Sequence, residues 1–222
     1  MSLNKIDLDQ FTGSRKKEIS VFFVIFYLVG IIGLSLSFSF PLFLELIPFA
    51  LLLSFLGLIL FHPSKKDKKS ILVFIGIFIT GFIIEAIGVN SGLIFGHYEY
   101  GKSLGFKLFS TPVIIGLNWL FLVYTTSSVL EKFKIHNLLK VILASLLMVV
   151  YDIVLEQVAP KIDMWYWKND LIPIQNYLAW FGIAVFFHSV IKVSKIKTEN
   201  ALAHILLICQ FLFFLSLLIL LG

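Results

Sequence analysis

The fold is decided by residues 70–89, which read SILVFIGIFITGFIIEAIGV. This stretch contains one charged side chain, Glu85, and it follows a lysine cluster that ends at Lys69. A transmembrane helix needs about 20 predominantly apolar residues to cross the hydrocarbon core of a bilayer. The stretch therefore predicts a spanning helix that begins beside a basic loop and carries an acid near its other end.

The rest of the chain has the same character. Of its 222 residues, 59% are hydrophobic and 14% are charged, whereas an ordinary soluble domain has about 25% charged residues. We therefore expect an all-α integral membrane protein, with an amino-terminal segment over 1–18 and a single transmembrane domain over 19–222. The predicted spans are 19–40, 42–61, 70–89, 111–130, 137–158, 177–193 and 201–221. Thr111 is expected to cap the fourth span, with Pro112 as its first helical residue.

The basic residues alternate between the two sides of the predicted membrane. All but four of the 18 lysines and arginines fall on one side. Cytoplasmic loops carry an excess of lysine and arginine, so this side is predicted to be cytoplasmic, as is the amino terminus, and the carboxyl terminus is predicted to lie outside. The four exceptions, in two long outer loops, are Lys102, Lys107, Lys161 and Lys168.

Four carboxylic acids lie within the predicted spans, and one of them, Glu45, is near the outer interface at the start of the second span, where no catalytic role is expected. A charged group at the centre of a spanning helix costs roughly 2.5–3.5 kcal/mol on insertion scales, so Glu85, Asp152 and Glu156 are candidate catalytic residues. Asp152 and Glu156 are one helical turn apart and share a face. All three belong to the outer half of the membrane, where we expect at least one of them to donate a proton.

Other candidates are suggested by residue type. Glycines on the Glu85 face leave a smooth groove for a helix or a flat ligand. Tryptophans and tyrosines of the outer side form either an interfacial belt or a site for a conjugated ligand or a carbocation. Asn118 could orient an acid or a water, and Asn176 is expected to cap a helix or bind substrate. The candidate binding residues are Gly81, Gly88, Gly92, Tyr98, Tyr100, Trp119, Trp165, Trp167, Asn176 and Trp180.

Several functional classes are disfavoured. The five histidines are isolated, unlike the clustered ligands of a membrane di-iron enzyme, so no metal site is predicted. The last span, 201–221, has no lysine for a retinal Schiff base. The net charge of +5 is carried by short loops and does not indicate nucleic-acid binding.

A set of motifs resembles the carotenoid biosynthesis protein family. It comprises residues 85–92 (EAIGVNSG), 95–100 (FGHYEY), 118–119 (NW), 151–156 (YDIVLE) and 165–167 (WYW). That family includes hydratases of the bisanhydrobacterioruberin hydratase type, which add water to the terminal double bond of an acyclic carotenoid. The resemblance implies a cofactor-independent hydratase that uses a carotenoid and water, is embedded in the bilayer of a bacterial or archaeal cell membrane, and can associate with other carotenoid enzymes.

Two alternatives to a hydratase remain open. A carotenoid end-group cyclase would share the proton donor and the cation but exclude water. A transporter or proton relay would need polar residues in both halves of the membrane. The inner half is nearly bare, with Thr80, Thr125, Thr126 and Ser145 as the main exceptions, and this argues against a relay.

Overall fold

The computed structural model describes residues 14–63 and 67–222, and among these it has seven long helices. Each of them is long and apolar enough to cross a membrane. The predicted number of spans is confirmed, and the chain is a multi-pass membrane protein. The helices are α2 (Lys16–Ser35), α3 (Phe40–Leu60), α4 (Lys68–Ser91), α5 (Ile114–Glu131), α6 (Asn137–Val158), α7 (Ile174–Val193) and α8 (Ala203–Leu220).

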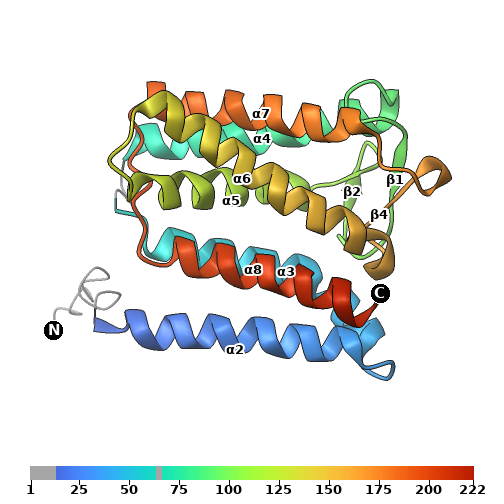
Figure 1. Cartoon of the computed structure of the whole chain (residues 1–222). Coiled ribbons are helices and arrows are strands. Elements are labelled where there is room, and N and C mark those ends of the chain that lie inside the picture. Colours follow the sequence, from blue (N-terminus) through green and yellow to red (C-terminus); the bar gives the residue numbers. More distant parts are fainter. Residues whose placement is uncertain (1–13, 64–66) are drawn as a thin grey trace, which may run out of the picture.

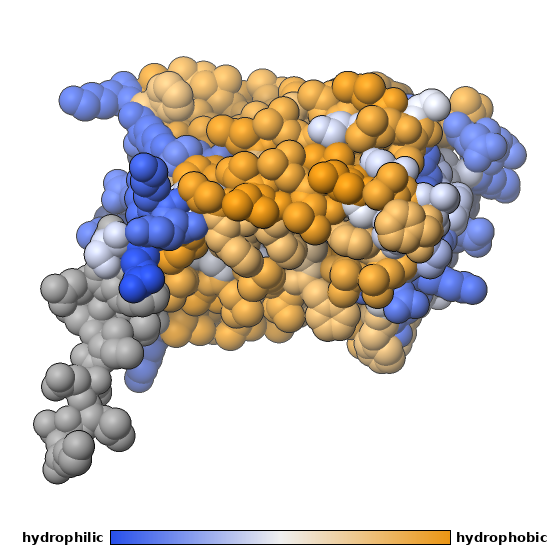
Figure 2. All heavy atoms as spheres, turned by 90° about the horizontal axis from the view of Figure 1, so that it is seen from below, coloured by the Kyte–Doolittle hydropathy of each residue, from blue (hydrophilic) through white to orange (hydrophobic). Residues whose placement is uncertain are grey.

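The helices form a layered bundle around α5. In Figure 1, α4 and α7 lie on one side, α5 and α6 in the middle, α3 and α8 next, and α2 on the opposite side. α5 contacts α3, α4, α6, α7 and α8, and nearly all of its side chains are buried. The outer helices expose Leu, Ile, Val and Phe side chains, which Figure 2 shows as an apolar band between two hydrophilic ends. This band is the surface expected to face lipid.

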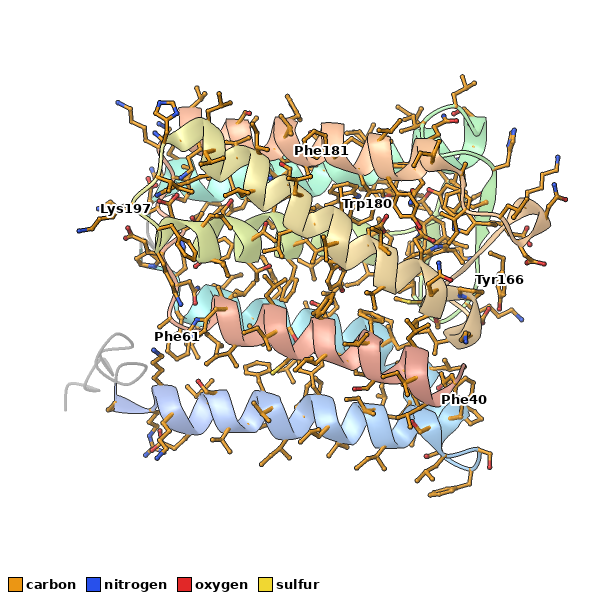
Figure 3. All side chains as sticks on the ribbon, viewed as in Figure 1. Phe40, Phe61, Tyr166, Trp180, Phe181 and Lys197 are labelled. Atoms are coloured by element: carbon orange, nitrogen blue, oxygen red, sulfur yellow. The ribbon has the colours of Figure 1, made fainter. Side chains whose placement is uncertain are left out.

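The two ends of the bundle differ in character. We call the end that carries residues 92–113 and 159–173 the loop end, and the opposite end, where most of the described lysines gather, the basic end. Figure 3 labels Phe61 and Lys197 at the basic end and Phe40 and Tyr166 at the loop end. α2 begins at the basic end and α8 finishes at the loop end (Figure 1). The odd number of helices therefore places the termini of the helical domain at opposite ends.

The amino-terminal segment predicted over 1–18 can be followed only in part. Residues 1–13 lie outside the described part of the chain. Residues 16–18 belong to the first turn of α2, so the first helix begins three residues before the predicted position 19.

The predicted start of the fourth span is wrong. Thr111–Pro112 is a short strand, β3, paired with β2 (Lys107–Leu108), and α5 begins at Ile114 after an N-cap at Val113. Phe109 and Ser110 between the strands both have positive φ, 51° and 62°. Positive φ at both central residues is the geometry of a two-residue hairpin turn, and this turn holds Thr111 opposite Leu108 instead of at a helix cap.

The bundle is helical, as predicted, and short strands are found at its loop end. β1 (Tyr98–Tyr100) pairs antiparallel with β4 (Trp165–Trp167), and two short 3-10 helices, η1 (Ala159–Ile162) and η2 (Lys168–Asp170), flank β4. This two-stranded sheet joins the two long loops, which lie far apart in sequence, over the loop end of the bundle.

Candidate active site

The register of the β1–β4 sheet orients four aromatic side chains. Tyr98 is opposite Trp167, and Tyr100 is opposite Trp165. Because successive side chains of a strand point to opposite faces, these four share one face, and their rings form two cross-strand pairs with centroids 5.0 and 6.1 Å apart. This face is directed into the bundle, while the intervening Glu99 and Tyr166 are exposed.

Glu85 accepts hydrogen bonds from three aromatic donors. The hydroxyls of Tyr98 and Tyr100 donate to its Oε2 at 2.7 and 2.8 Å. The indole nitrogen of Trp119 donates to its Oε1 at 2.9 Å. Burial raises the pKa of both tyrosines well above the ordinary value of 10.0, and the charge of Glu85 adds to the effect. Both phenols therefore keep their protons and remain donors.

Glu156 is held in the same way by the other strand. The indole nitrogens of Trp165 and Trp167 donate to its Oε2 at 2.9 and 2.6 Å. The Asn176 amide donates to its Oε1 at 3.1 Å. The tyrosines of β1 thus donate to Glu85 of α4, and the tryptophans of β4 donate to Glu156 of α6.

Asp152 is bound differently from the two glutamates. The Asn176 amide nitrogen donates to Asp152 Oδ2 at 2.9 Å and so bridges Asp152 and Glu156. Asp152 is completely buried, and its Oδ1 has no hydrogen-bond partner among the described residues. In this part of the chain, no lysine or arginine forms an ion pair with any of the three acids, and the ion pairs of Lys140 and Lys192 go to Glu131.

The role expected of Asn176 as a helix cap is wrong. α7 begins at Ile174 with Pro173 as its N-cap, so Asn176 lies inside the first turn. Its side chain is 1% exposed and points between the two acids of α6. An amide has two donor hydrogens, and here each is used by one carboxyl group.

A small cavity lies between Glu85 and Glu156. Its volume is about 20 Å³, which is enough for roughly one water molecule. Polar atoms around it could supply the two to four partners that a buried water needs. The lining residues are Glu85, Phe95, Tyr98, Tyr100, Ile115, Asn118, Glu156, Trp165, Trp167, Asn176 and Trp180.

A much larger apolar cavity adjoins the small one. Its volume is about 330 Å³, within the range of about 300–1,000 Å³ usual for small-ligand sites. It is lined by residues of α2, α3, α5, α6 and α8 and of the loop end. Ile115, Asn118 and Trp165 line both cavities. Among the described residues nothing hydrogen-bonds the Asn118 amide, which therefore remains available at the boundary between a polar and an apolar compartment.

The four tryptophans are buried inside the bundle. Their exposed fractions are 0% for Trp119, 6% for Trp165, 8% for Trp167 and 5% for Trp180. Trp119 and Trp180 are stacked with ring centroids 4.3 Å apart, and Figure 3 shows Trp180 within the bundle. An interfacial belt would place these rings at the lipid surface, so their burial favours the site over the belt.

The glycines expected to border a ligand groove instead contact the chain's own side chains. A Cβ atom at Gly81 would lie 2.9 Å from Trp119 Cβ, one at Gly88 would lie 2.5 Å from Phe95, and one at Gly92 would lie 2.2 Å from His97. The expected occupant of the groove was a helix or a flat ligand. A helix, α5, fills the space beside Gly81, whereas side chains of the loop end fill the space beside Gly88 and Gly92. Close approach of α5 to α4 is what brings the Trp119 indole to Glu85.

A second polar cluster lies in the half of the bundle nearer the basic end. His188 of α7 is hydrogen-bonded with Thr126 at 2.9 Å and with Ser145 at 3.2 Å. Its position is eight residues, or about 12 Å, along α7 from Trp180. Phe187, next to His188 in the chain, packs against the Trp119 ring, whose indole nitrogen donates to Glu85.

A family model described as carotenoid biosynthesis protein matches residues 45–222, well over half of the chain. The chain belongs to the carotenoid biosynthesis protein family. The matched region includes all three acids, both strands of the β1–β4 sheet and the bridging Asn176. No curated protein and no solved structure shows a significant match. Membership implies a role in carotenoid biosynthesis and a carotenoid as substrate.

One part of the candidate site, the wall of the large apolar cavity, was not predicted from the sequence. The apolar cavity takes much of its wall from α2 and α3, where no candidate was predicted. The side chains that line it there are mostly Phe, Leu and Ile, which any spanning helix contains, so no local signal separates a cavity wall from a lipid-facing surface.

Proposed function

We propose that the chain adds water to the terminal C=C bond of an acyclic carotenoid end group. The observation that carries the proposal is the single-water cavity between two carboxyl groups, which borders an apolar cavity at Ile115, Asn118 and Trp165. The apolar cavity would hold the hydrocarbon end group. The small cavity would hold the water that reacts with it.

The reaction needs one proton and one nucleophile. A carboxylic acid protonates the less substituted carbon, the π electrons form the new C–H bond, and a tertiary carbocation results. The water oxygen then bonds to this cation, and a carboxylate takes the released proton. The net change is the addition of H and OH, without oxidation or reduction, so the chemistry itself requires no redox cofactor.

Glu156 is the proposed proton donor. Asp152 and Glu156 are one turn apart and share a single amide partner, and two adjacent buried carboxylates repel each other, which favours one shared proton. Of this pair, only Glu156 lines the small cavity. Asp152 would act through Glu156, as a positioning residue that helps to keep the shared proton.

Glu85 is the proposed base and cation-stabilising group. Like Glu156 it accepts from three donors, but it has no second carboxyl group one turn away on its own helix with which to share a proton, and it lines the same cavity as Glu156. It would accept the proton of the attacking water. Transfer of that proton back to Glu156 restores the starting state. The faces of Trp165 and the neighbouring rings would stabilise the developing positive charge.

The orientation of the bundle is also a proposal. Most of the described lysines gather at the basic end, and by the positive-inside rule this end would face the cytoplasm. The candidate site near the loop end would then lie in the outer half of a bacterial or archaeal cell membrane.

The decisive experiment is expression in a host that accumulates lycopene, followed by mass spectrometry of the pigments. Hydration predicts a product heavier than its precursor by one water. An unchanged mass with an altered retention time would instead indicate a cyclase. If several acyclic carotenoids stay unchanged while the protein is present in the membrane, both enzymatic readings fail and the proton relay gains support.

A further inference from the structure

Two buried polar side chains of the large apolar cavity are unused by the proposed reaction. They are Tyr151 of α6 and Gln210 of α8, which are 2% and 7% exposed. Both line the cavity. The Tyr151 hydroxyl and Gln210 Oε1 have no hydrogen-bond partner among the described residues.

Gln210 occupies the middle of α8, whose sequence AHILLICQFLFFLSLLIL is otherwise strongly apolar. A polar group without a hydrogen-bond partner is strongly disfavoured in a membrane interior. A hydrophobic residue at position 210 would avoid that penalty. Gln210 lies one turn before Phe214, whose ring contacts the Tyr151 ring with centroids 5.8 Å apart. The two polar side chains thus line the same cavity from two helices that contact each other.

A third polar residue of the same cavity shows the contrast. The Tyr27 hydroxyl is hydrogen-bonded with Ser54 at 2.9 Å. The Tyr27 hydroxyl thus has a hydrogen-bond partner within the protein, whereas the Tyr151 hydroxyl and Gln210 Oε1 have none among the described residues. The difference points to a partner outside the described part of the chain for the latter two.

We infer that Tyr151 and Gln210 form a subsite for a hydroxyl group on the bound carotenoid. The inference rests on the proposed function, since it takes the cavity to be the carotenoid site. A hydroxyl can accept from the Tyr151 O–H and donate to Gln210 Oε1. That hydroxyl could be the one formed by hydration, or one already present on the substrate, and the two sources share the same recognition chemistry.

The test is carotenoid binding to the purified, detergent-solubilised protein, measured by the quenching of tryptophan fluorescence. Three ligands are compared: lycopene, its terminal tertiary alcohol, and an acyclic carotenoid with an intact end group and a hydroxyl elsewhere. We expect one of the two alcohols to bind roughly tenfold more tightly than lycopene, as suits one or two buried hydrogen bonds. Preference for the tertiary alcohol identifies the product hydroxyl, and preference for the other identifies an oxygenated substrate.

The variants Tyr151→Phe and Gln210→Met remove the polar atoms with little change of volume, and both should abolish the preference. Tyr27→Phe makes the same change at a paired tyrosine of the same cavity and should keep it. Equal binding of all three ligands to the wild-type protein would overturn the inference and leave water as the partner. Turnover is measured on the same preparations, so a retained preference without hydration would refute the proposed function and leave the subsite standing.

Discussion

The indole nitrogen of Trp119 lies 2.9 Å from Oε1 of Glu85. This hydrogen bond joins the central helix α5 to the carboxyl group of its neighbour α4, at a point where Gly81 lets the two helices approach. Trp119 has no exposed surface and stacks on Trp180 of α7. One indole thereby connects three helices to one acid, and the position of that acid depends on their packing.

Replacing Glu156 by glutamine should abolish most product formation. The amide keeps the shape of the side chain but has no acidic proton, and general acid catalysis typically contributes about 10²–10⁴-fold. Product per unit of membrane-inserted protein, measured by chromatography of the pigments, should fall by that range. Glu99→Gln, which changes an exposed acid on β1, is the matched control and should leave the yield unchanged.

Glu85 and Asp152 should differ from each other in their response to the same change from acid to amide. Glu85→Gln replaces one acceptor oxygen by an NH₂ group that cannot accept from its donors, so a loss similar to that of Glu156→Gln is expected. Asp152→Asn removes the carboxyl group that shares a proton with Glu156 but leaves Glu156 itself in place, and it should cost less, on the order of tenfold. If all three amide variants stay active at normal abundance, the acids are only links between helices and the acid-catalysed mechanism is wrong.

Two glycines of α4 allow a test of the helix contact. Gly81→Ala would place a Cβ atom 2.9 Å from Trp119 Cβ, whereas one at Gly76 would meet nothing within 4 Å. Moving Trp119 disturbs its bond to Glu85, and we expect at least a tenfold loss of activity from Gly81→Ala. Gly76→Ala should be fully active and equally abundant, since alanine is favoured over glycine in a helix by about 1 kcal/mol. Equal activity of the two variants would show that the Trp119 position is unimportant.

Alkaline pH should expose the coupling of Tyr98 and Tyr100 to Glu85. The folded pKa of each phenol is raised above its ordinary value of 10.0 by burial and then by the charge of Glu85. The stabilisation is therefore complete below that value and is lost as the pH rises through the folded pKa. Thermal unfolding in detergent should show a steeper alkaline loss of stability for the wild type than for the double variant Tyr98→Phe/Tyr100→Phe. Phenolate absorption from these two tyrosines near pH 10 in the folded protein would contradict the prediction.

The membrane orientation can be tested with reporters fused to the carboxyl terminus. With seven spans and the basic end in the cytoplasm, a reporter that is active only in the cytoplasm should be silent after Gly222. One that works only outside should be active there. Strong cytoplasmic activity of the fusion would reverse the orientation or change the number of spans.

The seven spans could be predicted because the bilayer imposes a simple requirement on local composition. About 20 apolar residues suffice to recognise a span, and α6 has the predicted limits of 137–158. The start of α5 could not be found in this way, because Thr111 and Pro112 suit a helix start as well as a strand. The hairpin turn at Phe109 and Ser110 decided between them.

The sequence by itself determined that this is a seven-span membrane protein and that Glu85, Asp152 and Glu156 are its costly buried acids, since both conclusions depend on local residue type. Only the tertiary structure decided which donors each acid receives. That choice depends on the register of β1 against β4, two segments between which α5 and α6 lie in the chain. Side chains alternate along a strand, so a slip of one residue would turn Glu99 or Tyr166 inward in place of the tyrosines and tryptophans that hold the acids.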